Sequence, residues 1–411
     1  MSTTGVQCGS HRFRPAGLVW CCVLLSTIAL GCSEAGNPSI ETASSSREYD
    51  IAFDSVPLVP RPPLTLHRTS RIARSSPDVA LTLVQRLVVD ARGNSYVDDW
   101  TAHEVPVVDP SGGPVRVVGR EGSGPGEFRV IGDVDILGGD ELLVYDPELE
   151  RITVFAPGTD SVLTLISVPY QPPGPQLTGI RAAGGADPML VGVYTSAYDP
   201  RNVRERGRVV TVRTLSMTGM VVDSILTFPY KENLVHISDG GHGFSVTTKP
   251  FGRRGFIRVG GDRIYYGWTD TVGVRTYSLR GEFAGGFKAA YERAEVTPAD
   301  LDQALQELDE RWARQALQEN PPESWPAFED FVVDDRGRAW FGITGEGGVT
   351  TRWDGFTPEG AYVGSLEFPP DFDLKAVQGD RAYGVQINEL DVPRIDVYRI
   401  EWVPVGEGAA S

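Results

Sequence analysis

Two observations predict an all-β fold built from repeated four-stranded units. Two apolar strands around a Gly-containing turn recur, as in LVVDARGNSYVDD around Gly93 and FVVDDRGRAWFG around Gly337. The six copies have turn glycines at intervals of 46, 46, 76, 76 and 42 residues, at Gly93, Gly139, Gly185, Gly261, Gly337 and Gly379. A propeller blade takes about 40–50 residues, which three of these intervals match. The sequence thus predicts a six-bladed β-propeller.

The two ends of the chain are expected to complete one blade together. Only 32 residues follow Gly379, too few for a whole blade. The segment 64–72 (LTLHRTSRI) precedes the first hairpin and belongs to no blade of its own. We therefore expect it to supply the outer strand of the last blade, which removes the open edge of the ring.

Charged pairs follow the hairpins at a fixed spacing. Asp146 precedes Arg151 by five residues, and Asp270 precedes Arg275 by the same number. We expect such a carboxylate to bridge the loop to its arginine and to fix the register of neighbouring strands.

One inserted amphipathic helix is predicted at 297–319, within the long interval before Gly337. Thr297 offers an N-cap, and Pro298 suits the first helical position. An apolar face recurs every three to four residues, at Leu301, Leu305, Leu308, Trp312 and Ala316. This face either packs on the propeller between blades four and five or docks a partner.

The N-terminus predicts export and a lipid anchor. An apolar run of about 15 residues, shorter than a membrane-spanning helix needs, follows Arg12 and Arg14 and indicates a signal peptide over 1–31. The run ends in Ala-Leu-Gly-Cys32, which resembles a bacterial lipobox. After cleavage Cys32 is the single cysteine left of four, as a lipid anchor requires. The alternatives are an uncleaved membrane anchor and an ordinary signal peptide beside an incidental cysteine.

The remaining chain divides into a polar, Ser-rich tether over 32–49 and the propeller over 50–411. Ser33 after the cysteine, by resemblance to the sorting rules of Gram-negative lipoproteins, permits transfer to the outer membrane. Removal of two arginines with residues 1–31 changes the formal charge from 38 − 55 = −17 to 36 − 55 = −19. So acidic a chain argues against nucleic-acid binding, whereas calcium, cationic ligands and basic partner surfaces are compatible with it.

The stretch Val118-Gly-Arg-Glu-Gly-Ser-Gly-Pro-Gly-Glu-Phe128, with the hairpin after it and the strand Arg151-Ile-Thr-Val-Phe155, resembles an NHL repeat. From about residue 60 to 403 the chain is similar to bacterial six-bladed, NHL-like propeller lipoproteins. Related propellers include calcium-dependent lactonases and zinc-dependent amidating lyases, so the resemblance allows enzymatic chemistry without establishing it.

Candidate ligand-binding residues lie where the chain enters the innermost strands. Aligned on their hairpins, the blades place seven charged residues near the mouth of the central channel: Arg86, Asp133, Arg181, Arg253, Arg254, Asp330 and Asp373. They could bind a polar, carboxylate-bearing ligand through bidentate arginine contacts, or form a closed ion-pair network. His236 and His242 in a Gly-rich loop are weak candidates for a metal site.

No catalytic sequence motif is present: the chain has no G-x-S-x-G, P-loop, H-E-x-x-H or C-x-x-C. The leading hypothesis is a non-catalytic ligand-binding or protein-scaffolding lipoprotein of the cell envelope that needs no cofactor. Its partners would be the membrane, through the anchor, and an envelope protein or a polar small molecule. The alternative is a calcium- or zinc-dependent hydrolase, lactonase or lyase with its site at the channel mouth.

Overall fold

The computed structural model describes residues 41–43, 55–57, 62–72, 81–99, 102–170, 174–184, 188–198, 208–238, 243–370, 372–387 and 392–402. The predicted positions Cys32, Gly185 and His242 lie outside these ranges. The chain divides into two compact units, and all described residues belong to the second, Pro38–Ser411.

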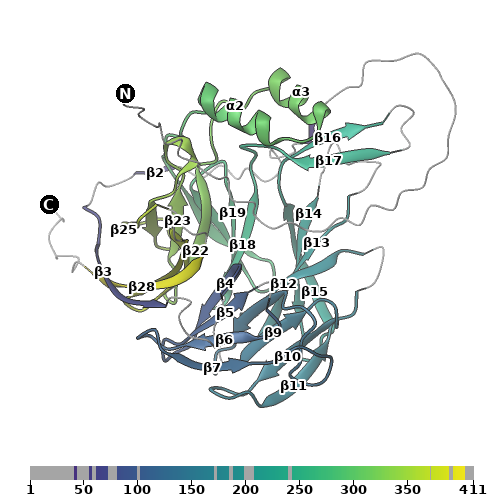
Figure 1. Cartoon of the computed structure of the whole chain (residues 1–411), viewed down its shortest axis with the longest axis vertical. Helices are drawn as coiled ribbons and strands as arrows, with labels where there is room; N and C mark the ends of the chain where they lie inside the picture. The colour runs from purple at the N-terminus through teal and green to yellow at the C-terminus, as the bar shows by residue number, and fades with distance from the viewer. Residues whose placement is uncertain are drawn as a thin grey trace, which may run out of the picture. The chain divides into compact units, whose positions relative to one another are not determined.

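Six antiparallel sheets form the blades of a six-bladed β-propeller, which confirms the predicted fold class (Figure 1). Blade 1 consists of β4 (Val84–Val89), β5 (Ser95–Asp99), β6 (Val105–Val108) and β7 (Pro114–Val118). Blade 2 consists of β8 (Asp133–Ile136), β9 (Leu142–Asp146), β10 (Arg151–Phe155) and β11 (Val162–Ser167). Blade 3 consists of β12 (Gln176–Ala183), β13 (Met189–Thr195), β14 (Val209–Leu215) and β15 (Val221–Pro229).

The second half of the ring follows the same order of strands. Blade 4 consists of β18 (Gly255–Gly260), β19 (Arg263–Trp268), β20 (Gly273–Ser278) and β21 (Phe283–Ala289), with β2 (Ser55–Val56) added in parallel to β21. Blade 5 consists of β22 (Phe328–Val333), β23 (Ala339–Ile343), β24 (Arg352–Phe356) and β25 (Tyr362–Glu367). Blade 6 consists of β26 (Phe372–Gln378), β27 (Arg381–Ile387), β28 (Pro393–Glu401) and β3 (Thr65–Ile72).

The last blade confirms the predicted closure between the two ends of the chain. Strand β3 pairs antiparallel with β28, from Ile72 opposite Ile395 to Thr65 opposite Glu401. The first strands of the blades are the innermost, and each contacts the first strand of the next blade, including β26 with β4. The edge that a linear array of blades would expose is thus paired within the chain.

Among the described residues, six apolar clusters lie at the junctions between consecutive blades, and three smaller ones lie around the helical segment and the β16–β17 hairpin. The cluster between blades 1 and 2 contains Tyr96 and Phe128, and the cluster between blades 4 and 5 contains Phe331 and Phe341. The cluster between blades 6 and 1 joins Tyr383 to residues of β4 and β5, so the ring closes through side-chain packing as well as through β3.

The recurring hairpin turn depends on a buried aspartate. Asp90 accepts hydrogen bonds from the backbone N–H groups of Arg92 and Asn94, at 3.0 and 2.8 Å, and from the hydroxyl of Tyr96. In blade 5, Asp334 accepts in the same way from the N–H groups of residues 336 and 338 and from the indole of residue 340. Gly93 and Gly337 occupy the positive-φ position that each turn requires, at 86° and 74°.

The inserted helical segment differs from the single helix predicted over 297–319. It forms α2 (Pro298–Glu307) and α3 (Arg311–Glu319), with the predicted N-cap at Thr297, where the side chains of Thr297 and Asp300 form a capping box. The break falls at Leu308, whose backbone is extended (φ −80°, ψ 117°) and whose carbonyl accepts a hydrogen bond from Arg314. That side chain therefore stabilises the turn between the helices.

The helical segment packs on its own domain, as the first of the two predicted alternatives states, but its contacts include the hairpin between blades 3 and 4 instead of blades 4 and 5 alone. Trp312 and Ala316 contact Leu234 of β16 (Asn233–Ile237), and Leu317 packs with Phe251 and Trp325. The hairpin of β16 and β17 (Phe244–Thr248) accounts for part of the long third interval. It also pairs with β1 (Glu41–Ala43), three residues of the segment predicted to be a flexible tether.

Neither described helix has the length and apolarity needed to cross a bilayer.

Candidate functional site

Eight charged side chains of the inner strands surround the axis of the propeller and are called the inner ring below. The predicted members are Arg86, Asp133, Arg181, Asp330 and Asp373, and the structure adds Asp135, Arg258 and Lys375. They come from all six blades, because each innermost strand contributes at least one of them.

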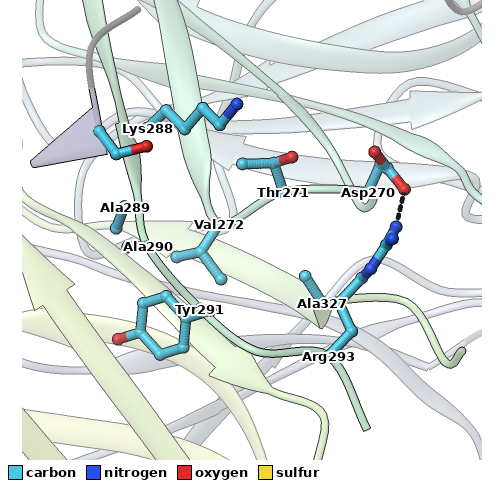
Figure 2. Close-up of a pocket in the computed structure, with 10 residues that line it drawn as sticks. Asp270, Thr271, Val272, Lys288, Ala289, Ala290, Tyr291, Arg293 and Ala327 are labelled. Atoms are coloured by element: carbon cyan, nitrogen blue, oxygen red, sulfur yellow. Dashed lines mark hydrogen bonds and ion pairs between the residues drawn. The ribbon is translucent and has the colours of Figure 1, made fainter. Parts of the chain in front are cut away.

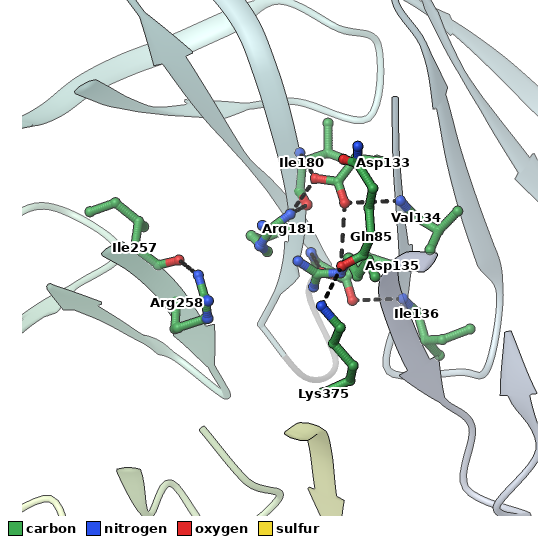
Figure 3. A network of polar contacts seen from close by, with 12 residues as sticks. Gln85, Asp133, Val134, Asp135, Ile136, Ile180, Arg181, Ile257, Arg258 and Lys375 are labelled. Carbon is green, nitrogen blue, oxygen red and sulfur yellow. Dashed lines mark hydrogen bonds and ion pairs between the residues drawn. The ribbon is translucent and has the colours of Figure 1, made fainter. Parts of the chain in front are cut away.

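Asp133 is the centre of the better-buried half of the inner ring. Its carboxylate pairs with Arg181 of the next blade and lies 3.6 Å from Nε of Arg86 of the preceding blade. Backbone N–H groups of Val134 and Ile180 donate to the same carboxylate at 3.0 and 2.9 Å (Figure 3). One aspartate therefore ties three consecutive blades together.

Asp135 extends this network along β8. Its Oδ2 lies 3.3 Å from Nη2 of Arg86 and accepts a hydrogen bond from the N–H of Ala182 at 3.0 Å. Asp133 and Asp135 are two residues apart on one strand and so point to the same face of the sheet. This alternation is the signal that could have identified Asp135 from the sequence.

The other half of the inner ring is formed by two further ion pairs. Arg258 pairs with Asp330 of the next blade and donates to the carbonyl of Phe331 at 2.8 Å. Lys375 lies 2.9 Å from Asp373 and donates to the carbonyl of Gln85 at 3.0 Å, which joins blade 6 to blade 1. In Figure 3, Lys375 approaches the Asp135 cluster, whereas Arg258 stands apart on the neighbouring sheet.

Burial and neighbouring charges shift the pKa of three groups in and next to the inner ring. Burial alone would lower the pKa of Arg86, but Asp135, Asp133 and Asp98 outweigh it and raise this pKa. Burial and then Arg86 lower the pKa of Arg181. Burial, followed by the charge of Asp133, raises the pKa of Asp98 well above its ordinary value, although Arg86 opposes the shift.

Asp98 belongs to the site but was not among the predicted residues. It lies on β5 directly opposite Arg86 in the register of blade 1, and it is 1% exposed. Its Oδ1 has no hydrogen-bond partner among the described residues. The raised pKa keeps this buried carboxyl neutral over a wider pH range, which avoids an uncompensated buried charge.

Arg253 and Arg254 lie just before β18, and the structure pairs both outside the inner ring. Arg253 donates to Asp270 at 3.0 Å and to the hydroxyl of Ser324 at 2.9 Å, which links blade 4 to the segment after α3. Arg254 donates to the carboxylate of Glu329 at 2.9 Å.

Of the two candidate metal ligands, His236 is described. Its ring stacks on Trp312 with centroids 5.5 Å apart, and its Nδ1 is buried without a hydrogen-bond partner among the described residues. Within the described ranges, no three His, Cys, Asp or Glu side chains are arranged so that they could hold a metal ion.

A second polar hollow lies on blade 4, away from the inner ring. Its volume is about 310 Å³. The lining residues come from the β19–β20 turn, the end of β21 and the segments beside them, and include Ser55, Asp270, Thr271, Lys288, Tyr291 and Arg293 (Figure 2).

Comparisons with known proteins give only distant structural likenesses. No protein-family model and no curated protein sequence matches the chain. A candidate exported protein of Bacteroides fragilis is similar with a TM-score of 0.47 and 12% identity, over 82% of this chain and 95% of that one. Virginiamycin B lyase of Staphylococcus aureus has a TM-score of 0.41 and 11% identity, over 82% and 99%. Hydrazine synthase of Kuenenia stuttgartiensis has a TM-score of 0.42 and 11% identity, over 80% and 99%. These likenesses are too slight to inform the chemistry of this chain.

Proposed function

We propose that this chain is an exported, lipid-anchored β-propeller that binds a carboxylate-bearing ligand at its inner ring and does not catalyse a reaction. One observation carries the ligand class. Arg86 and Arg181 flank the same carboxylate, yet the Nε of each is buried without a hydrogen-bond acceptor among the described residues.

An unsatisfied buried donor is costly, at about 1–3 kcal/mol, and more when the group is charged. The Asp133 carboxylate already lies between the two guanidinium groups, so a ligand carboxylate would enter beside it and accept from their remaining donors. Arginine is well suited to this contact because its planar donors match the geometry of a carboxylate. The side chains of Arg86 and Arg181 are 24% and 14% exposed, so they remain partly accessible.

Isothermal titration calorimetry of the mature, detergent-solubilised protein with succinate, glutamate and citrate tests this proposal. We expect at least one acid to bind and succinamide, the uncharged analogue, to bind at least tenfold more weakly. Arg181→Lys keeps the charge but removes Nε–H and the fork geometry, so it should weaken binding by about tenfold. If no acid binds, or if Arg181→Lys folds normally and binds as well as the wild type, the proposed ligand site is wrong.

The anchor is tested separately from the ligand. Mass spectrometry of the protein purified from membranes should show cleavage before Cys32 and acylation of its thiol. Cys32→Ser should release the protein from the membrane fraction, and density-gradient separation should place the wild type in the outer membrane. An unmodified Cys32 in the purified chain would exclude lipid anchoring.

Elemental analysis distinguishes the proposed binding function from a metal-dependent hydrolase, lactonase or lyase. The protein is purified without chelator or affinity histidines. Stoichiometric calcium or zinc would overturn the non-catalytic proposal in favour of the metalloenzyme, with the inner-ring aspartates and His236 as the first residues to replace.

A further inference from the structure

The hollow on blade 4 has a polar lining that the inner-ring proposal does not use. It lies where the β19–β20 turn meets the end of β21, and its volume of about 310 Å³ suits a small metabolite. Lys288, Arg293 and Thr271 supply donors, and Asp270 supplies acceptors. Tyr291 contributes its ring, since its hydroxyl donates to Asp354.

The orientation of Asp270 is fixed by two arginines. Arg253 donates to its Oδ1 at 3.0 Å, and Arg293 donates to the same oxygen. Arg253 is itself held by the carbonyls of Phe251 and Ser324, at 2.8 and 3.2 Å. The second oxygen, Oδ2, receives no hydrogen bond from the described residues and is therefore able to accept one from a ligand.

Lys288 provides a cation that the described protein does not neutralise. No ion pair or side-chain hydrogen bond joins its ammonium group to another described residue. Figure 2 shows the Lys288 amino group and the Asp270–Arg293 pair on either side of Thr271 in that view.

The charge balance of the hollow identifies the class of ligand. Two cations line the hollow, Lys288 and Arg293, beside the single carboxylate Asp270. Arg253 lies outside the lining but pairs with Asp270, so the charges in and next to the hollow sum to 3 − 1 = 2. This excess is unusual in a chain of formal charge −17. A phosphate monoester carries about −1.5 to −2 near neutral pH, whereas a carboxylate or a phosphodiester carries about −1.

We propose that this hollow is a second ligand site, which binds a small phosphorylated polyol or sugar. The phosphate group contacts Lys288, Arg293 and the hydroxyl of Thr271, and a ligand hydroxyl donates to Oδ2 of Asp270. Lysine acts here as a point charge and arginine as a planar donor, the two modes by which proteins hold phosphate. The hollow is distinct from the inner ring, because its residues belong to blade 4 and to the segments adjoining it.

Calorimetry of the mature protein with glycerol 3-phosphate tests the proposal. We expect glycerol 3-phosphate to bind at least tenfold more tightly than glycerophosphoglycerol, a diester that carries half the charge, and glycerol not to bind. Inorganic phosphate should bind more weakly than glycerol 3-phosphate, because it lacks the polyol hydroxyls that reach Asp270. Equal affinity for the ester and the diester would overturn the assignment, as would the absence of binding at about 10 mM ligand.

Variants localise the site. Lys288→Gln keeps the length of the side chain but removes the charge, and Thr271→Val keeps the shape but removes the hydroxyl. The first should weaken glycerol 3-phosphate binding by about tenfold and the second by a smaller factor. Arg280→Gln removes one charge at the opposite ends of β20 and β21 and should leave affinity unchanged. If Lys288→Gln folds normally and binds like the wild type, the site is refuted, whatever the outcome of the succinate titrations at the inner ring.

Discussion

Replacement of Asp146 should reveal how much the blades depend on carboxylates that bind backbone groups. The side chain is fully buried. One oxygen accepts from the N–H groups of Glu148 and Leu149, both at 2.9 Å, and the other accepts from Arg129 and Val130, at 2.7 and 3.4 Å. The carboxylate thus joins the loop after β9 to the segment that leads into β8.

The expected loss follows from these contacts. A hydrogen bond to a charged group contributes about 1.5–3 kcal/mol, and the two bonds on one oxygen share its acceptor strength. Counting each oxygen once, Asp146→Ala should destabilise the protein by about 3–6 kcal/mol, which places it among the severe substitutions. Asp146→Asn can keep one accepting oxygen, so its loss should be about half as large.

Urea unfolding followed by tryptophan fluorescence at pH 7 measures both variants. Asp160→Ala, an exposed acid in the turn before β11, is the matched control and should change stability by less than about 0.5 kcal/mol. If Asp146→Ala and Asp146→Asn both unfold at the wild-type urea concentration, the backbone contacts of Asp146 do not stabilise blade 2 and the reasoning is refuted.

Three further predictions follow from particular contacts. Burial and then Asp133 raise the pKa of Asp98 in the folded protein. Between the unfolded value of about 4 and this higher folded value, the unfolded chain binds fewer protons than the folded chain. The free energy of unfolding therefore falls as pH rises through this window. Asp98→Asn should therefore be more stable than the wild type at neutral pH and equal to it below about pH 4 in thermal unfolding; an equal difference at both pH values would contradict this. Deletion of 62–72 removes β3 and exposes β28, and the product should aggregate on gel filtration, whereas a monodisperse product would show that closure is dispensable. Trp312→Ala removes the ring that stacks on His236 and should lower the free energy of unfolding by about 1–3 kcal/mol, while the circular dichroism of the β-sheets is retained. Complete loss of folding would show that the helical segment is part of the folding core.

The blades could be predicted from the sequence because their main determinants are local. The turn around Gly93 requires a residue with positive φ, a buried aspartate before it and an aromatic residue after it, all within seven positions. The role of 64–72 followed from counting, since the last blade lacked one strand and this segment had no other partner. The break in the helical segment was harder to predict, because Leu308 fits the apolar spacing of one continuous helix. The break becomes evident only from the structure, where the Leu308 carbonyl accepts a hydrogen bond from Arg314.

The predicted bridge between Asp146 and Arg151 was wrong in its contacts. The two residues are opposite one another in the register of β9 and β10, as the spacing implies. However, the Asp146 carboxylate binds backbone N–H groups, and Arg151 donates to the carbonyls of Ser123, Gly124 and Glu127. Spacing identified neighbours, but an unpaired backbone group is an equally good partner for a charge, and sequence does not show which groups are unpaired.

The ion pairs of the inner ring were also hard to predict from the sequence, because their partners are far apart along the chain. Asp133 pairs with Arg181, 48 residues away, and Arg258 pairs with Asp330, 72 residues away. Alignment of the hairpins placed Asp133 and Arg181 near the axis, since these residues sit at similar offsets from their turns. It could not place Arg253 and Arg258 correctly, because the choice between them depends on where the β16–β17 hairpin ends and β18 begins.

Asp98 links ligand affinity to pH if the inner ring binds carboxylates. With Asp98 neutral, the four cations of the inner ring face four carboxylates, at Asp133, Asp135, Asp330 and Asp373. Ionisation of Asp98 adds a fifth negative charge beside Arg86, which repels an incoming carboxylate and competes for the same guanidinium. By linkage, affinity for succinate should fall as pH rises past the folded pKa of Asp98. Succinate is almost fully ionised above pH 7, and comparison with Asp98→Asn in a calorimetric series from pH 7 to pH 9 separates Asp98 from the other groups of the site. Asp98→Asn should bind with the same affinity throughout that range, and a variant that still loses affinity in parallel with the wild type would show that a different group controls the site.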